Sequence, residues 1–294
     1  MCEETKHPKK KPIAIIASCM AWGSGHKSAE NGPKLLLNAG LADRLSAKKV
    51  TIIEPIIPFG GEGVAYEQVI MEQAGRVSQT VEGVAKEGFF PVVIGGDHTS
   101  AIGFYTGLSR AFGQLGVVWI DTHPDLNTPE TSPSGNIHGM VMAGLLGRGS
   151  TQMLAATKEV NISDFHVAMV GVRSVDESEK KWLDEGRISC MTMDHVNKVG
   201  LEQCLSSAVQ IANGTSSGFG ITIDLDAIDP NQAPFVATPV EGGIDVDALT
   251  KSLGAIPHRE CLLGMEVTEF TPRSNEDAEA GVDLVANLVS SAVC

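Results

Sequence analysis

The chain alternates between short apolar runs rich in β-branched residues and longer segments whose apolar positions recur with helical spacing. Runs such as residues 90–94 and 218–223 are typical of buried parallel strands, whereas residues 66–87 have the pattern of an amphipathic helix. The predicted strands cover residues 12–18, 50–54, 90–94, 116–121, 166–172, 188–192, 218–224 and 261–267, and the main predicted helices begin at Pro33 or cover residues 66–87, 99–113, 176–186, 200–213, 245–254 and 275–292. This alternation predicts a single three-layer α/β/α domain with an eight-stranded, mostly parallel sheet.

Composition narrows the class of protein. A chain of 294 residues with 43% hydrophobic residues can bury one large core, so we expect one domain over residues 1–294, with residues 1–11 as a disordered leader. The net charge of −14 disfavours nucleic acid and anionic membranes as partners, and no apolar run is long enough to cross a bilayer. The chain lacks a signal-peptide pattern at its start, and its six cysteines form no Cys-x-x-Cys pair. These features favour a cytoplasmic protein with reduced thiols.

Acidic and imidazole side chains follow three of the predicted strands. The strands lead into Gly95-Gly96-Asp97-His98, Asp121-Thr122-His123-Pro124-Asp125 and Asp224-Leu225-Asp226. Open α/β sheets place their ligand sites at the carboxyl ends of the strands. Aspartates that converge there would repel one another unless cations held them together. We therefore predict a metal site at this edge, with Asp97 as the exception, since we expect it to fix the turn that aims His98.

The ligand types indicate which metal. Carboxylates mixed with imidazole, without a nearby thiolate, suit hard or borderline divalent ions such as manganese. Residues 121, 123 and 125 can face a common centre because alternate side chains of an extended segment share one side, and Asp224 and Asp226 repeat this spacing. Six donors, four of them aspartates, exceed what one tetrahedral ion uses, so two metals bridged by carboxylates fit better.

Together these motifs, with the continuation Asp226-Ala227-Ile228-Asp229-Pro230, resemble the signatures of the ureohydrolases, the arginase and agmatinase superfamily. The loop from Asn127 to Gly139 resembles its bacterial arginase branch, and the resemblance runs from about residue 30 to the C-terminus. It implies a hydrolase with two Mn²⁺ ions per subunit, with other divalent ions such as Co²⁺ possible, that converts L-arginine to L-ornithine and urea. It also implies a homotrimer or homohexamer.

The resemblance assigns roles residue by residue. One metal would be held by His98, Asp121, Asp125 and Asp224, and the second by His123, Asp121, Asp224 and Asp226. A water bridging both metals would supply the hydroxide that attacks the guanidinium carbon. His138 would carry a proton to the leaving amine, and Asp125 and Glu266 complete the catalytic set.

Substrate recognition is assigned to the same loop and to two acids beyond it. By resemblance, Asn127, Ser134 and Asn136 would bind the α-carboxylate, Ser132 would keep a hydroxyl that the family uses, Asp176 would meet the α-amino group, and Glu266 would lie near the guanidinium. Asp176 is also a candidate N-cap of the helix at 176–186, with Glu179 completing a capping box. Ser174 replaces an acid that is frequent in animal members. The loop at residues 22–31 receives no role.

Two other functions are compatible with these residues. An agmatinase, or a hydrolase of another guanidino compound, would keep the metal ligands but would not need residues that bind an α-carboxylate. The residues Asn127, Ser134 and Asn136 argue against it. A non-catalytic metal-binding scaffold or regulatory subunit would have inherited the fold, and the intact ligand set together with His138 argues against that function.

Overall fold

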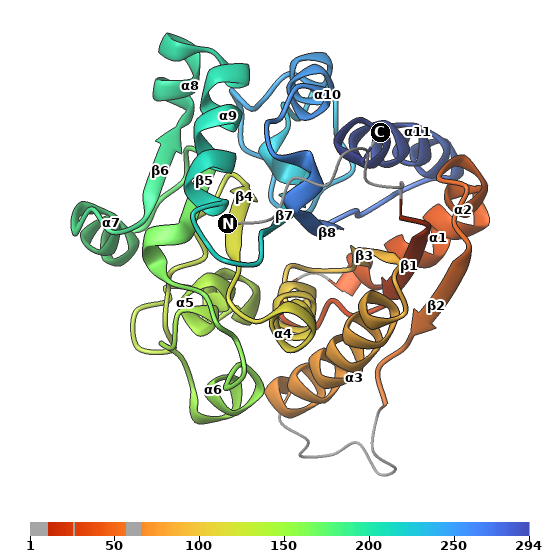
Figure 1. Cartoon of the computed structure of the whole chain (residues 1–294), viewed down its shortest axis with the longest axis horizontal. Coiled ribbons are helices and arrows are strands. Elements are labelled where there is room, and N and C mark those ends of the chain that lie inside the picture. Colours follow the sequence, from red (N-terminus) through yellow and green to blue (C-terminus); the bar gives the residue numbers. More distant parts are fainter. Residues whose placement is uncertain (1–10, 26, 57–65, 294) are drawn as a thin grey trace.

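The computed structural model describes residues 11–25, 27–56 and 66–293 (Figure 1). Its eight strands form one sheet in the order β2-β1-β3-β8-β7-β4-β5-β6, and every strand pairing is parallel. The strands are β1 (Ile13–Ser18), β2 (Lys49–Ile53), β3 (Phe90–Gly95), β4 (Gly116–Ile120), β5 (Val167–Val172), β6 (Ser189–Thr192), β7 (Phe219–Asp224) and β8 (Leu262–Thr268). The predicted strands are confirmed, each to within one or two residues at either end.

Helices cover both faces of the sheet, which gives the predicted three layers (Figure 1). One face carries α1 (Gly32–Asn38), α2 (Leu41–Arg44), α8 (Met193–Val199), α9 (Leu201–Ala212), α10 (Val246–Gly254) and α11 (Asn275–Val293). The other carries α3 (Tyr66–Lys86), α4 (Ser100–Phe112), α5 (Val141–Leu145), α6 (Thr151–Ala156) and α7 (Glu177–Asp184). The sequence pattern missed α2, α5, α6 and α8, because helices of one or two turns are too short to show a helical period.

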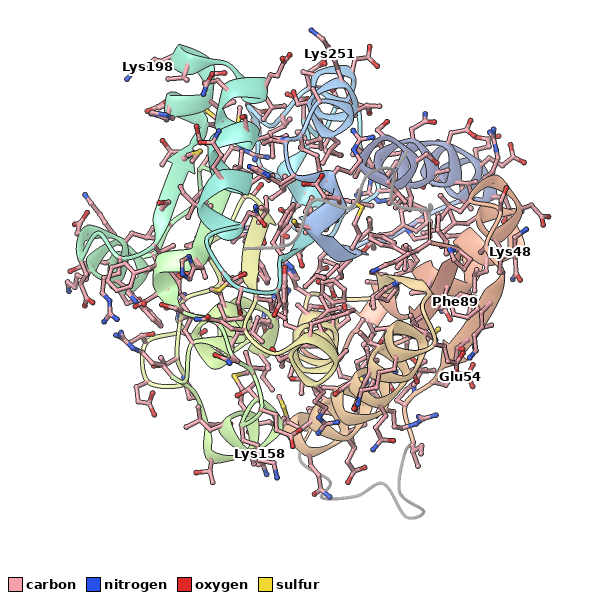
Figure 2. The ribbon with its side chains drawn as sticks, in the orientation of Figure 1. Lys48, Glu54, Phe89, Lys158, Lys198 and Lys251 are labelled. Carbon is pink, nitrogen blue, oxygen red and sulfur yellow. The ribbon has the colours of Figure 1, made fainter. Side chains whose placement is uncertain are left out.

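The burial of the strands explains why the apolar runs are continuous. Every residue of β1, β3, β4, β5, β7 and β8 is buried, whereas the edge strands β2 and β6 are partly exposed. A strand between two helical layers has apolar neighbours on both sides, so its sequence does not alternate. Charged side chains such as Lys198 and Lys251 lie on the outside of the helical layers (Figure 2).

Three expectations about the whole chain can be compared with the structure. Within the described ranges, no helix is both long enough and apolar enough to span a bilayer. Cys19 and Cys204 are buried free thiols, Cys190 is a partly buried free thiol, and Cys261 is buried. The leader expected at residues 1–11 lies, apart from Lys11, outside the described residues.

Candidate metal centre

The strand-end segments meet at one edge of the sheet, as the parallel arrangement predicts. β3, β8, β7 and β4 are neighbours at the middle of the sheet, so their carboxyl ends lie side by side. Two groups of ligand atoms form there, one from His98, Asp121 and Asp125 and the other from Asp121, His123 and Asp226, and within each group the atoms lie within 4.8 Å of one another. Asp121 belongs to both groups, which is the arrangement that a carboxylate bridging two ions requires.

Asp224 joins these groups through His98. The Nδ1 atom of His98 lies 3.1 Å from Asp121 Oδ2, 3.2 Å from Asp125 Oδ2 and 3.2 Å from Asp224 Oδ2. On the other side, His123 Nδ1 lies 3.2 Å from Asp226 Oδ2 and 3.7 Å from Asp121 Oδ1. All six predicted ligands are therefore brought together, although they come from three separate segments of the chain.

Backbone hydrogen bonds fix the carboxylates of the two bridging candidates. The N–H of His123 donates to Asp121 Oδ1 at 2.7 Å, and the N–H of Asp226 donates to Asp224 Oδ1 at 2.8 Å. In both cases the second carboxylate oxygen is directed toward the cluster. Asp125 adopts a left-handed backbone conformation with φ of 53°, which is uncommon for a residue with a side chain and is found at functional sites.

The electrostatics of the cluster favour cations. Burial raises the pKa of Asp224 well above its usual value, and the neighbouring Asp226 and Asp121 raise it further. Burial and Asp121 likewise raise the pKa of Asp125. Burial alone would lower the pKa of His98, but the surrounding carboxylates outweigh it and raise this pKa. Asp125 and Asp224 hold protons strongly because their negative charges are buried beside other carboxylates, and a divalent cation would supply the missing positive charge.

The residues present fit a pair of divalent ions. Asp121 Oδ2 is buried and receives no well-directed hydrogen bond from any described residue, and an unsatisfied buried carboxylate oxygen is costly unless a cation or donor meets it. The donors are carboxylate oxygens and imidazole nitrogens, which suit manganese and similar ions. The ring of His98 is held by stacking on Trp119, with ring centroids 4.2 Å apart and planes at 7°.

Asp97 has the structural role that the sequence predicted. Its Oδ1 accepts a hydrogen bond from the N–H of Thr99 at 3.1 Å, which closes the turn around His98. Its Oδ2 accepts from the N–H groups of Gly23 and Ser24 at 2.7 and 3.0 Å. Asp97 therefore also ties the loop after β1 to the metal-site turn.

His138 lies in the short 3-10 helix Ile137–Met140, next to an acid that the sequence analysis missed. Its Nδ1 is 3.0 Å from Glu269 Oε1, and the same oxygen accepts a hydrogen bond from the N–H of His98 at 2.9 Å. Glu269 is 1% exposed, and its Oε2 has no hydrogen-bond partner among the described residues. Its position directly after a central strand was the available signal, since the metal ligands occupy equivalent positions.

Glu266 lies deeper, inside β8. It is fully buried, and its two carboxylate oxygens accept hydrogen bonds from Ser100 Oγ at 2.5 Å and from Thr222 Oγ1 at 3.0 Å. Burial raises its pKa to about 7. Each oxygen of Glu266 accepts one of these hydrogen bonds, and its contact with a guanidinium stays a prediction, whereas Glu269 is the acid that lies beside His138.

The predicted substrate residues fall into two parts. Asn127 Nδ2 donates to Asp176 Oδ2 at 2.8 Å, so these two residues are in contact. Asp176 caps α7, and its N–H donates to Glu179 Oε2 at 2.9 Å in the predicted capping box. Ser132, Ser134 and Asn136 lie farther along the loop, where Ser134 Oγ accepts from the N–H of Asn136 at 3.2 Å. Their roles toward a substrate stay predictions.

Comparisons with known proteins agree with this geometry. The model of the arginase family matches residues 11–294. The arginase of Bacillus caldovelox is 34% identical over 292 residues, which cover 95% of this chain and 98% of that protein. The crystal structure of arginase from Bacillus subtilis has a TM-score of 0.83 at 32% identity and covers 95% of this chain and 98% of its own. That of Entamoeba histolytica arginase in complex with L-ornithine has a TM-score of 0.85 at 25% identity, with the same coverage. The chain therefore belongs to the arginase family, whose members are hydrolases.

Proposed function

We propose that this protein hydrolyses L-arginine to L-ornithine and urea with two Mn²⁺ ions per subunit. The observation that carries the proposal is the buried cluster in which Asp121 is shared by two groups of ligand atoms, with His138 and the Asn127–Asp176 contact present in the same chain. The names of the relatives support the choice of arginine. We also infer, from the free thiols and from the family, a cytoplasmic homotrimer or homohexamer.

The ions would be held by the six strand-end residues. One would be bound by His98, Asp121, Asp125 and Asp224, and the other by His123, Asp121, Asp224 and Asp226. When bound, two such ions lower the pKa of a water molecule and orient it for attack on a carbon that is a poor electrophile. The chain contributes the geometry, because backbone N–H groups fix the carboxylates of Asp121 and Asp224.

His138 would move the proton that the leaving amine needs. Amines are poor leaving groups unless protonated, so the reaction needs a general acid at the nitrogen. Glu269 holds the His138 ring at Nδ1, which leaves Nε2 free to exchange that proton. For the acid near the guanidinium we retain Glu266 and add Glu269, because Glu269 Oε2 is a buried acceptor without a donor.

The loop and α7 would recognise the amino-acid end of the substrate. Asn127, Ser134 and Asn136 would donate to the α-carboxylate, with Ser132 nearby, and Asp176 would accept from the α-amino group. Asn127 donates a hydrogen bond to Asp176, so the subsites for the α-carboxylate and the α-amino group would be held at a fixed separation. An agmatinase has no use for the first subsite, and this is the feature that favours arginine.

Turnover with arginine and with agmatine, measured side by side as urea release from manganese-loaded protein, tests the proposal. We expect urea from arginine and little from agmatine. Preference for agmatine would indicate that the protein is an agmatinase. No urea from any guanidino compound, despite two bound ions, would indicate a homologue without activity.

The ligand assignment has its own test. Asp125→Asn and His98→Asn each remove a ligand from one ion only, so at limiting manganese the metal content should fall toward one ion per chain. Metal analysis of the desalted variants measures this. Two ions retained in either variant would show that the ligand set is wrong.

A further inference from the structure

The glycine-containing loop after β1, residues 22–25, has no role in the chemistry described so far. Gly23 nevertheless lies between the two halves of the site. Its carbonyl oxygen accepts a hydrogen bond from the N–H of His138 at 3.1 Å, and its own N–H donates to Asp97 Oδ2 at 2.7 Å. One residue thus connects the turn that carries His98 with the backbone of His138.

From these contacts we infer that Gly23 and Asp97 are positioning residues that set the place of His138 relative to the metal centre. This inference rests on the proposed role of His138 as the group that moves the proton. Neither residue touches a predicted metal ligand atom or substrate subsite with its side chain. Gly23 acts through hydrogen bonds of its own backbone, and Asp97 acts through hydrogen bonds that its carboxylate accepts from Gly23, Ser24 and Thr99.

The space around Gly23 explains why this position is glycine. A Cβ atom there would lie 2.3 Å from Thr99 Cγ2, 3.0 Å from Asp97 Oδ2 and 3.3 Å from the nitrogen of His138. The first distance is shorter than any real carbon contact, so a methyl group would push the turn at Thr99 and the segment at His138 apart. The constraint is close approach, because Gly23 is not among the glycines with a positive φ.

The loop is anchored on its other side, so it cannot simply move away. Trp22 Nε1 donates to Glu30 Oε2 at 3.1 Å, and the ring of Trp22 meets that of Tyr66 edge-on at 5.4 Å. Lys27 Nζ lies 4.9 Å from the centre of the Trp22 ring. Asp97 is fully buried and bonded to Gly23, Ser24 and Thr99.

His138 is consequently fixed twice to the same turn. Its side chain is held by Glu269, which also accepts from the N–H of His98, and its backbone is held by Gly23, which is bonded to Asp97. Both connections lead back to the end of β3. Because a misplacement of about 1 Å can cost roughly 100-fold in rate, a change at Gly23 is expected to affect kcat without contact with substrate.

Gly23→Ala tests the inference, with Gly25→Ala as the matched control. A Cβ at Gly25 would lie 3.7 Å from the nearest atom, Asn136 Nδ2, which is an ordinary contact. We expect Gly23→Ala to retain two ions, to lower kcat by roughly 10- to 100-fold with little change in KM, and to accelerate amide exchange at residues 136–140. Gly25→Ala should resemble the unaltered protein in all of these measurements.

A compensating substitution makes the test specific. Thr99→Ser removes Cγ2, the atom nearest to the added methyl group, and keeps the hydroxyl that bonds Asp97. The double variant Gly23→Ala/Thr99→Ser should therefore regain part of the lost kcat and of the amide protection, including the case in which Gly23→Ala alone does not fold. Asp97→Asn should accelerate the same exchange. Unchanged kcat and unchanged exchange in Gly23→Ala, or loss of ions as its main effect, would overturn the inference.

The exchange measurement separates this inference from the proposed function. If the unaltered protein releases no urea, the proposed function fails, whereas the effect of Gly23→Ala on exchange at residues 136–140 still shows whether Gly23 fixes His138. If urea is released but exchange there is the same in both proteins, the positioning role alone fails.

Discussion

The metal-site turns and the loop at residues 127–136 use the same local chemistry in different surroundings. In the turns, Asp121 and Asp224 accept hydrogen bonds from backbone N–H groups two residues farther on. In the loop, Ser134 does the same for Asn136, and Ser132 accepts from the N–H of Gly135, three residues farther on. The side chain of Asp121 is 1% exposed, whereas Ser134 is exposed. Burial, more than the type of turn, therefore decides how much a substitution costs.

This difference divides the expected effects. Changes at the buried turns should alter ion content and stability, because only a cation or a proton can neutralise the buried aspartates there. Changes in the loop should leave the fold intact and alter substrate affinity, because water can satisfy an exposed backbone group. Five predictions, in order of decreasing size of effect, test this division.

Removal of the ions should have the largest effect. Asp125 and Asp224 have raised pKa values because of burial and neighbouring aspartates, so without ions some of these acids must take up protons or separate. An ion that binds only the folded state adds about 4 kcal/mol to the free energy of unfolding at a thousandfold excess over its Kd. Melting curves with a chelator and with added Mn²⁺ measure this. A melting temperature that is the same in both conditions would contradict a metal centre at this edge.

His138→Asn should lower kcat by about 10²–10⁴-fold, or roughly 3–5 kcal/mol of barrier, because general acid–base help is lost. Its ion content should not change, since His138 is no metal ligand in this assignment. His195→Asn, at an exposed histidine of α8, is the matched control. Steady-state kinetics and metal analysis decide the outcome, and added imidazole should restore part of the rate. Loss of manganese, or an unchanged kcat, would mean that His138 has another role.

Glu269→Gln should shift the pH dependence of kcat. Burial alone would lower the pKa of His138, but Glu269 at 3.0 Å outweighs it and raises this pKa to about 9. A donor of protons works while it is protonated, so kcat should fall as the pH rises through about 9, and in Glu269→Gln this fall should occur at lower pH. pH–rate profiles of the loaded proteins measure it. An identical fall of kcat at high pH in both proteins would show that Glu269 does not set the pKa of His138.

The same raised pKa predicts the sign of a stability effect. Because the folded-state pKa of His138 lies above the free value of about 6.5, the protonated pair with Glu269 stabilises the folded state fully below that pH. This contribution is lost as the pH rises through about 9. Denaturant titrations between these limits should therefore show a smaller pH dependence in Glu269→Gln.

Asn136→Ala should have the smallest effect and should be selective. Loss of one hydrogen bond to the α-carboxylate is worth about 1 kcal/mol, so KM for arginine should rise by roughly 5- to 10-fold with little change in kcat or melting temperature. Agmatine lacks the carboxylate, so its inhibition constant is the control and should stay the same. If the binding of arginine and of agmatine were weakened equally, Asn136 would not bind the α-carboxylate.

The sequence alone determined the strands and the candidate ligands, for a physical reason. In a parallel sheet the carboxyl ends of the strands share one edge, so acids that follow 90–94, 116–120 and 218–223 must lie at that edge, and they meet there because β3, β8, β7 and β4 are neighbours. Their identity as ligands needs only the chemistry of Asp and His. The capping box at Asp176 and Glu179 could also be predicted from the sequence, because both residues lie within the first turn of one helix.

The tertiary structure decided which groups surround His138. Glu269 is 131 positions away in the sequence; it reaches the turn at His98 because β8 lies beside β3 in the sheet, and His138 is held at the same turn. Alternation along β8 could not show where Glu269 points, since the strand ends at Thr268 and Glu269 itself has a left-handed φ of 65°. The role of Gly23 could not be predicted for a related reason. Its close approach to Thr99 and His138 requires a glycine, but a glycine in a sequence can have many other functions. Periodicity and residue chemistry describe one segment at a time, whereas contacts between distant segments depend on the order in which the strands assemble.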